Sequence, residues 1–270
     1  MSTAICYFSG TGNSRHAADR LVAALPSARL EPIVELLSSG SPVVDADTVG
    51  IVFPIHAFTI PHVVARFLKD VEFRNVSYVF ALSTRLCSSS VAARIDRLLR
   101  RKDLRLGSFH AVLGPQSYLP TFPVATDCDA ARMDTELDSA IPAIAKAIER
   151  RDRVLPHDPF VLAVVARTLF MFMRLMYRVT DSFRLGKRFY ADSRCTGCGI
   201  CTSVCLAKRI DLHNDKPVWN SSIPCMQCFA CLHYCPEGAI QIKSTTTPKK
   251  GRFHFPGITH RMIAEQRSKG

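Results

Sequence analysis

Eight of the eleven cysteines in this 270-residue chain are crowded between Cys195 and Cys235. They form two runs with the same spacing, Cys-x2-Cys-x2-Cys-x3-Cys, and Pro236 follows the second run. Disulfides would explain such a density in a secreted protein. The first residues, however, lack the basic and the long apolar regions of a signal peptide. The pattern therefore favours metal ligation in the cytoplasm.

The spacing within each run indicates the kind of metal centre. Three thiolates two residues apart can wrap one face of an iron–sulfur cubane, whereas the fourth points away and completes the neighbouring cluster. This predicts a crossed pairing, with one [4Fe–4S] cluster on Cys195, Cys198, Cys201 and Cys235 and the other on Cys225, Cys228, Cys231 and Cys205. Gly197 and Gly199 are expected to direct amide hydrogens at cluster sulfur. A pair of zinc sites is the alternative, although zinc ligands are usually grouped as two plus two.

Residues 189–242 resemble the bacterial two-cluster ferredoxins, which implies a small α+β domain at 187–243. One departure is Leu206, which follows Cys205 where many members have proline. The charge distribution agrees with bound clusters. Residues 1–150 hold 16 basic and 15 acidic side chains, and residues 151–270 hold 19 and 8. An oxidised cubane with four thiolates carries about −2, so the basic excess does not require nucleic acid, and Lys249-Lys250-x-Arg252 has no accompanying helix-turn-helix pattern.

Residues 1–151 alternate short apolar runs with helical patterns, which predicts a doubly wound α/β domain with a five-stranded parallel sheet. Strands are expected at 4–8, 30–34, 49–53, 78–82 and 109–113. Helices are expected after the first strand to about residue 25, and at 61–70, 88–102 and 129–151.

The loop after the first predicted strand offers an anion site, because backbone amides and the positive end of a helix meet there. It reads Ser9, Gly10, Thr11, Gly12, Asn13, Ser14. It is neither the G-x-G-x-x-G pattern nor a P-loop, since it has no lysine. A plain capped turn is the alternative. Within this sheet the loop resembles the FMN phosphate loop of flavodoxin, which implies a flavodoxin-like fold for residues 1–151 and FMN as cofactor.

In flavodoxin-like sheets the flavin lies at the carboxyl ends of the strands. The resemblance therefore implies that two further loops flank its ring, namely Pro54, Ile55, His56, Ala57 and Phe58, and then Ser83, Thr84 and Arg85. Phe58 and Tyr118 are candidates for stacking on the ring or for ordinary packing. Arg85 could neutralise a reduced flavin or be a solvated charge. His56 has no evident carboxylate partner and is interpreted as a loop residue.

Residues 152–186 are predicted to join the two domains. Within them, 160–178 is apolar except for Arg167, Arg174 and Arg178, which share one helical face. We interpret it as an inter-domain helix. An interfacial membrane helix with snorkelling arginines is the alternative. No stretch reaches the roughly 20 apolar residues of a membrane span. Residues 244–270 are predicted to be a basic tail.

The order of the two domains resembles the family of ferredoxins fused to an N-terminal flavodoxin-like domain. The likeness extends to Pro115-Gln116-Ser117-Tyr118, Lys216-Pro217-Val218-Trp219 and Arg252-Phe253-His254-Phe255-Pro256. It implies electron transfer between two [4Fe–4S] clusters and FMN, and to or from a partner oxidoreductase, in an anaerobic cytoplasm. The alternative is an FMN-dependent reductase of a small organic substrate. No second dinucleotide pattern is present, so direct oxidation of NAD(P)H is not expected. Cys6, Cys87 and Cys128 are interpreted as spare thiols.

Overall fold

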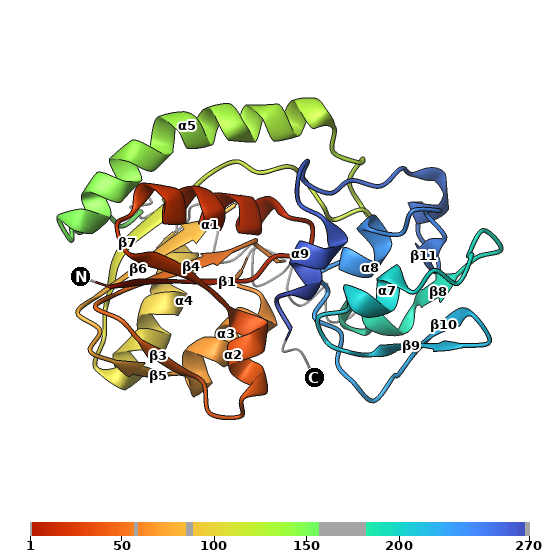
Figure 1. Ribbon diagram of the computed structural model, residues 1–270, viewed down its shortest axis with the longest axis horizontal. Coiled ribbons are helices and arrows are strands. Elements are labelled where there is room, and N and C mark those ends of the chain that lie inside the picture. Colours follow the sequence, from red (N-terminus) through yellow and green to blue (C-terminus); the bar gives the residue numbers. More distant parts are fainter. Residues whose placement is uncertain (1, 57–58, 85–88, 157–181, 268–270) are drawn as a thin grey trace.

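The computed structural model of the chain describes residues 2–56, 59–84, 89–156 and 182–267. The first half is a parallel sheet between two layers of helices, and the second half is a smaller lobe of short helices and strands (Figure 1). No helix among the described residues is both long enough and apolar enough to span a bilayer. The segment 160–178, for which an inter-domain or interfacial helix is expected, lies outside the described residues.

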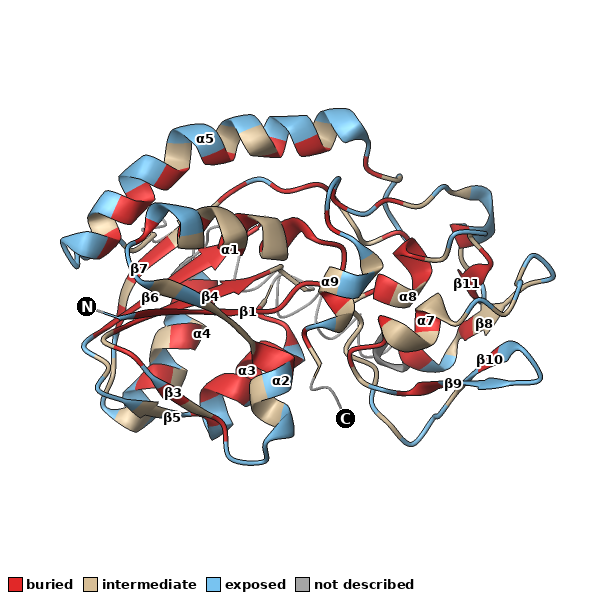
Figure 2. Ribbon diagram, viewed as in Figure 1, coloured by how far each residue is buried: buried red, intermediate tan, exposed pale blue. Residues whose placement is uncertain are grey.

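The five strands of the main sheet are all parallel and run in the order β2-β1-β4-β6-β7. Their bounds are β1 Thr3–Tyr7, β2 Ala28–Pro32, β4 Thr48–Phe53, β6 Tyr78–Ser83 and β7 Leu106–Ala111. Every residue of β1, β4 and β6 is buried (Figure 2), because helices cover both faces of the sheet. The order matches the flavodoxin-like arrangement and confirms the predicted fold class.

The helices of this half are α1 Asn13–Ala24, α2 Ile33–Ser38, α3 His62–Asp70, α4 Ser89–Leu99 and α5 Asp127–Glu149. α1 and α5 lie on one side of the sheet and α2, α3 and α4 on the other (Figure 1). α5 begins with a capping box, in which the Thr126 hydroxyl accepts from the Asp129 amide and the Asp129 carboxylate accepts from the Thr126 amide. Such caps satisfy the open amides of a first helical turn.

Two predicted strands are placed differently in the structure. The strand expected at 30–34 occupies Ala28–Pro32, because the chain turns at Pro32 and Ile33 begins α2. Proline cannot donate to a sheet and is tolerated at the end of this edge strand. The strand expected at 109–113 occupies Leu106–Ala111, where it pairs with β6. The small parallel pair of β3 Val43–Asp45 and β5 Glu72–Arg74 has no counterpart in the prediction.

The second half contains two antiparallel strand pairs and two single-turn helices. β8 Phe189–Ala191 pairs with β11 Ile240–Ile242, and β9 Ile210–His213 pairs with β10 Lys216–Trp219. The helices are α7 Ile200–Ser203 and α8 Ala230–His233. Short 3-10 helices occupy Arg100–Lys102, Ser182–Lys187 and Thr247–Lys249. Each single-turn helix follows the third-from-last cysteine of its run, so the two runs fold alike.

Residues 250–267, here named the C-terminal strap, pack against the first half of the chain. They include α9 His260–Ala264. The Phe255 amide donates to the Thr11 carbonyl at 2.8 Å, and the Phe255 ring stacks on His16 with centroids 4.2 Å apart. The fully buried Gln266 accepts from the Ser9 amide at 2.9 Å and donates to the Ser9 carbonyl at 2.8 Å. The stretch predicted as a tail therefore holds the loop after β1.

The basic side chains of the strap also hold the second half of the chain in place. They donate to backbone carbonyls: Lys250 to those of Leu119 and Phe122, Arg252 to those of Gly238 and Ile240, and Arg267 to those of Thr202 and Cys205. Part of the positive charge in this half thus serves to fix backbone segments.

Replacing Gln266 tests the contribution of the strap to stability. We expect Gln266→Leu to lower the free energy of unfolding by about 1–3 kcal/mol, because the buried amide and carbonyl of Ser9 lose their partners. The measurement is denaturant unfolding of the anaerobically purified chain. Arg261→Gln, on the exposed face of α9, is the control and should leave stability unchanged. Equal stability of the two variants would contradict the assignment.

Candidate functional site

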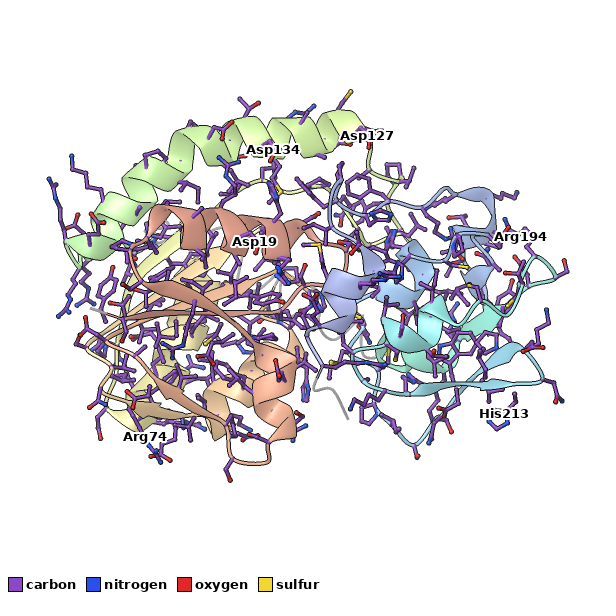
Figure 3. All side chains as sticks on the ribbon, in the orientation of Figure 1. Asp19, Arg74, Asp127, Asp134, Arg194 and His213 are labelled. Carbon is purple, nitrogen blue, oxygen red and sulfur yellow. The ribbon has the colours of Figure 1, made fainter. Side chains whose placement is uncertain are left out.

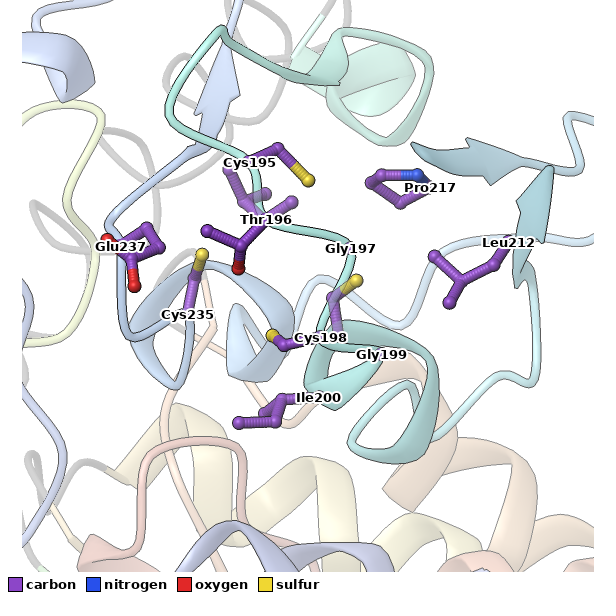
Figure 4. Close-up of a pocket in the computed structure, with 12 residues that line it drawn as sticks. Cys195, Thr196, Gly197, Cys198, Gly199, Ile200, Leu212, Pro217, Cys235 and Glu237 are labelled. Atoms are coloured by element: carbon purple, nitrogen blue, oxygen red, sulfur yellow. The ribbon is translucent and has the colours of Figure 1, made fainter. Parts of the chain in front are cut away.

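Four of the predicted cluster ligands line one cavity near the surface, here named the outer cavity. They are Cys195, Cys198, Cys201 and Cys235. Three come from the first run and the fourth from the second, as the crossed pairing expects. Figure 4 shows Cys195 and Cys235 on separate segments with their sulfur atoms turned toward the same space. Leu212 and Pro217, from the pair β9 and β10, form the opposite wall, and Cys198 is exposed.

The other four line a second cavity, here named the inner cavity. They are Cys205, Cys225, Cys228 and Cys231. Its remaining wall is largely aromatic and is made by Phe189, Trp219 and Phe229. Phe189 lies near both other rings, with centroids 6.4 Å from Trp219 and 6.2 Å from Phe229. The inner cavity faces the first half, since Cys228 and Cys231 pack against its hydrophobic core.

Matching backbone conformations place the cysteines of the two runs. Gly197 and Gly199 have φ of 75° and 77°, and the equivalent Gln227 and Phe229 have 53° and 59°. The left-handed turn is thus made with glycine once and with larger residues once. In each run the fourth thiol accepts an amide hydrogen bond from four residues on, since Arg209 N lies 3.4 Å from Cys205 Sγ and Ala239 N lies 3.3 Å from Cys235 Sγ. Bonds of this kind orient metal ligands.

Lys208 has φ of 49° where the equivalent residue is Gly238, with φ of 57°. We expect Lys208→Gly to raise the midpoint of thermal unfolding, because a left-handed conformation costs an L-residue roughly 1 kcal/mol. Lys208 is exposed and its backbone bond to Cys205 is kept. Lys243→Gly is the control at an exposed position without positive φ and should give no gain. A loss of stability in Lys208→Gly would refute the strain.

The thiols of both cavities are poorly suited to remain as free thiolates. Burial raises the pKa of Cys201 to about 11 and that of Cys228 to about 12, and neighbouring cysteines raise them further. Among the residues described, no three His, Cys, Asp or Glu side chains are placed to hold a single metal ion. Iron in a cluster supplies the positive charge that stabilises several adjacent thiolates. The donor set of each cavity therefore fits a cubane.

A buried positive charge gives a second indication for the inner cavity. Arg209 lines it and is only 3% exposed, yet its Nε atom has no hydrogen-bond partner. A buried charge without a partner is costly. A cluster with four thiolates is an anion of about −2, so it would supply the missing partner.

The loop after β1 is buried at the carboxyl end of the sheet. Its hydroxyl residues Ser9, Thr11 and Ser14 are at most 5% exposed. The Ser14 hydroxyl lies 2.9 Å from that of Thr84, after β6, and Asn13 Nδ2 donates to the Pro115 carbonyl at 2.8 Å. Asn13 Oδ1 is buried without a partner. Because the first amides of α1 also lack intrahelical acceptors, this loop fits a phosphate with adjoining hydroxyl groups.

The glycines of this loop admit the second half of the chain. A Cβ atom on Gly10 would lie 2.0 Å from the carbonyl oxygen of Cys228. One on Gly12, whose φ is +102°, would lie 2.8 Å from Cβ of Phe255 and 3.0 Å from that of Ile258. Gly10 thus lets the wall of the inner cavity touch the loop, and Gly12 does the same for the strap.

The loops expected beside a flavin ring are described only in part. Pro54, Ile55, Ser83 and Thr84 lie at the carboxyl ends of β4 and β6, whereas Ala57, Phe58, Arg85 and Cys87 are outside the described residues. His56 exchanges two backbone hydrogen bonds with Thr59, both 2.9 Å long. Burial lowers the pKa of His56 to about 4, so its ring is neutral at pH 7.

Tyr118 packs edge-on against Phe229, with ring centroids 5.4 Å apart. The candidate for flavin stacking therefore contacts the wall of the inner cavity. Among the spare thiols, Cys6 is buried in β1 and Cys128 is exposed. Neither lines a four-cysteine cavity.

Sequence reasoning missed His233 and Gln266. His233 Nδ1 accepts from the Phe253 amide at 3.2 Å, so Nε2 donates to the Ser117 carbonyl at 2.9 Å. This ring joins the second cysteine run to the strap and to the first half. The segments around Ser117 and Phe253 are noted in the sequence as family likenesses, but a pairing between them leaves no periodic pattern.

Comparisons with known proteins agree with part of this picture. Residues 194–240 match the family model of the 4Fe-4S dicluster domain, so the second half contains an iron–sulfur domain. Two solved structures are similar to the chain. A putative flavoprotein from Bacteroides uniformis is 20% identical with a TM-score of 0.31, and the match covers 42% of this chain and 90% of that one. The Trp repressor binding protein from Bacillus subtilis is 12% identical with a TM-score of 0.33, and the match covers 52% and 96%. No curated protein sequence matches.

The contact between Gly10 and Cys228 can be tested by adding one methyl group. We expect Gly10→Ala to lower the free energy of unfolding by about 1–3 kcal/mol, since overpacking of this size costs that much, and to reduce the iron content. Gly251→Ala is the matched control, because a Cβ there would meet only Val124 at 3.8 Å. Unfolding and iron content are measured on both. Full iron and unchanged stability in Gly10→Ala would show that the two halves are not in contact.

Proposed function

We propose that this chain is an electron-transfer protein that passes electrons between two [4Fe–4S] clusters and FMN, and to or from a partner oxidoreductase. The observation that carries the proposal is the shared wall between two sites. Cys228 lines the inner cavity, and its carbonyl touches Gly10 of the loop that fits a phosphate. An iron–sulfur domain and a flavodoxin-like sheet therefore meet at their candidate binding sites.

Each cavity would hold one cluster through the crossed ligand sets. This proposal rests on two cavities with four thiols each, drawn three from one run and one from the other. The amides of Arg209 and Ala239 hold the fourth thiols in place. The burial of Cys205 and Cys231 excludes water from the inner cavity.

FMN would bind with its phosphate in the loop Ser9 to Ser14. The loop offers small hydroxyl residues, the amides at the start of α1 and the buried Oδ1 of Asn13. It has no lysine or arginine, and the helix end supplies the positive potential. When bound, clusters exchange single electrons and a flavin accepts one or two. The protein contributes the fixed contact between the two sites.

The partner would meet the chain at the outer cavity. Cys198 is exposed there, and Leu212 and Val218 on the adjoining strands are 38% and 48% exposed. Residues at the far end of this lobe, such as Arg194 and His213, lie away from the sheet (Figure 3). The inner cavity faces the sheet and the outer cavity faces solvent, so the two ends of the proposed relay are distinct.

Cofactor analysis of anaerobically purified protein tests this proposal. We expect about eight iron, eight sulfide and one FMN per chain. Zinc is measured in the same sample. Two zinc ions without sulfide would overturn the cluster assignment, and iron without flavin would overturn the relay.

Removal of one hydroxyl tests the phosphate loop. We expect Ser14→Ala to weaken FMN binding about tenfold or more, because a hydrogen bond to a charged group contributes about 1.5–3 kcal/mol. Binding of riboflavin, which has no phosphate, should be unchanged. Flavin fluorescence gives both affinities, and the iron content should stay constant. Ser38→Ala, on the exposed end of α2, is the control. Equal loss of FMN and riboflavin binding would contradict a phosphate contact.

Anaerobic stopped flow separates a carrier from an enzyme. We expect NADH alone not to bleach the flavin, since the sequence has no dinucleotide site. We also expect small organic acceptors to give no turnover without a partner protein. Rapid bleaching by NADH, or turnover by the chain alone, would refute the carrier.

A further inference from the structure

The two cysteine runs are equivalent in backbone but differ in charge at one buried position. The fourth cysteine of each run is followed, four residues later, by an amide that bonds to its sulfur. That residue is Arg209 beside the inner cavity and Ala239 beside the outer one. A guanidinium is thus present at one member of a symmetric pair and absent at the other.

Arg209 faces the inner cavity from a fully enclosed position. It lines the cavity together with Cys205 and Cys225 and is 3% exposed. A Cβ atom added to Gly186 would lie 2.7 Å from Arg209 Nη1 and 2.5 Å from Cys225 Cβ, so Gly186 covers both. Among the described residues, no carboxylate forms an ion pair with Arg209, and its Nε has no partner. The charge of this side chain is therefore directed at the cavity contents.

Charges near the outer cavity are arranged differently. Glu237 lines it, where the equivalent residue of the inner cavity is Ala207. Arg194 is exposed and paired with Asp192 at 2.6 Å, and Lys216 is exposed with its Nζ on the Cys195 carbonyl. Exposed charges are screened by water and salt, whereas a buried charge acts at lower effective dielectric constant. Arg252 is the exception near Cys235, but it donates to the Gly238 and Ile240 carbonyls and does not line the cavity.

We propose that Arg209 selectively raises the reduction potential of the cluster in the inner cavity. The inference rests on the proposed function, because it requires clusters in both cavities. Reduction adds one negative charge to a cluster that already carries about −2. Burial alone opposes this added charge, and the adjacent guanidinium stabilises it. Arg209 thus offsets the penalty at the cavity that faces the flavodoxin-like half.

An anaerobic redox titration followed by electron paramagnetic resonance tests the proposal, with dithionite as the reductant. We expect Arg209→Gln to shift one of the two cluster midpoints to more negative potential by at least a tenfold change in its reduction equilibrium, which is 59 mV for one electron. The other midpoint should not move. Cys198→Ser and Cys228→Ser, which each alter a ligand of one cavity, assign the two signals.

Two further variants separate charge from packing. Arg209→Lys keeps the charge and should retain the wild-type midpoint. Lys208→Gln removes the same charge from the exposed neighbouring residue and should move neither midpoint. If Arg209→Gln fails to assemble the inner cluster while Arg209→Lys assembles it, the charge requirement is supported.

Three results would overturn the proposal: both midpoints unchanged in Arg209→Gln, equal shifts in Arg209→Lys and Arg209→Gln, or equal shifts in Lys208→Gln and Arg209→Gln. Wild-type protein without two clusters would instead refute the proposed function, and iron and sulfide analysis detects that outcome before any variant is made.

Discussion

The approach of the Cys228 carbonyl to Gly10 is the contact on which the arrangement of the two halves depends. No side chain fits between them, since a Cβ atom on Gly10 would overlap the carbonyl oxygen. The contact is secured from three directions, by the Gln266 bonds to Ser9, by the Phe255 bond to Thr11 and by His233 between Ser117 and Phe253. The loop after β1 is therefore a junction between the sheet, the iron–sulfur domain and the strap.

Internal repetition gives the iron–sulfur domain two similar cavities, and their surroundings make them unequal. The outer cavity has an exposed cysteine and a carboxylate at its rim. The inner one is enclosed by Phe189, Trp219 and Phe229 and contains a buried guanidinium. Low polarity and a fixed positive charge act in opposite directions on a reducible anion. A repeated motif can thus provide two centres with separately adjustable properties while the ligands stay the same.

Local patterns in the sequence were sufficient to predict the sheet, the loop after β1 and the grouping of the cysteines. Buried strands such as Thr48–Phe53 are continuous apolar runs, and the cysteine spacing depends only on neighbours along the chain. The sequence could not reveal α2, the three-residue strands β3 and β5, or the strap, because these elements are short and are stabilised by distant partners. Arg209 follows the same rule, since a buried arginine has no periodic signal before its surroundings are known.

The hydrogen bonds between Gln266 and Ser9 join residues 257 positions apart. During synthesis, the loop after β1 emerges from the ribosome long before its last partner exists. Domains generally fold as units from the amino terminus, so the sheet can form while the backbone of Ser9 is still bonded to water. Closure of that loop has to wait until both cysteine runs have been translated. The architecture thus makes completion of one site conditional on delivery of the other.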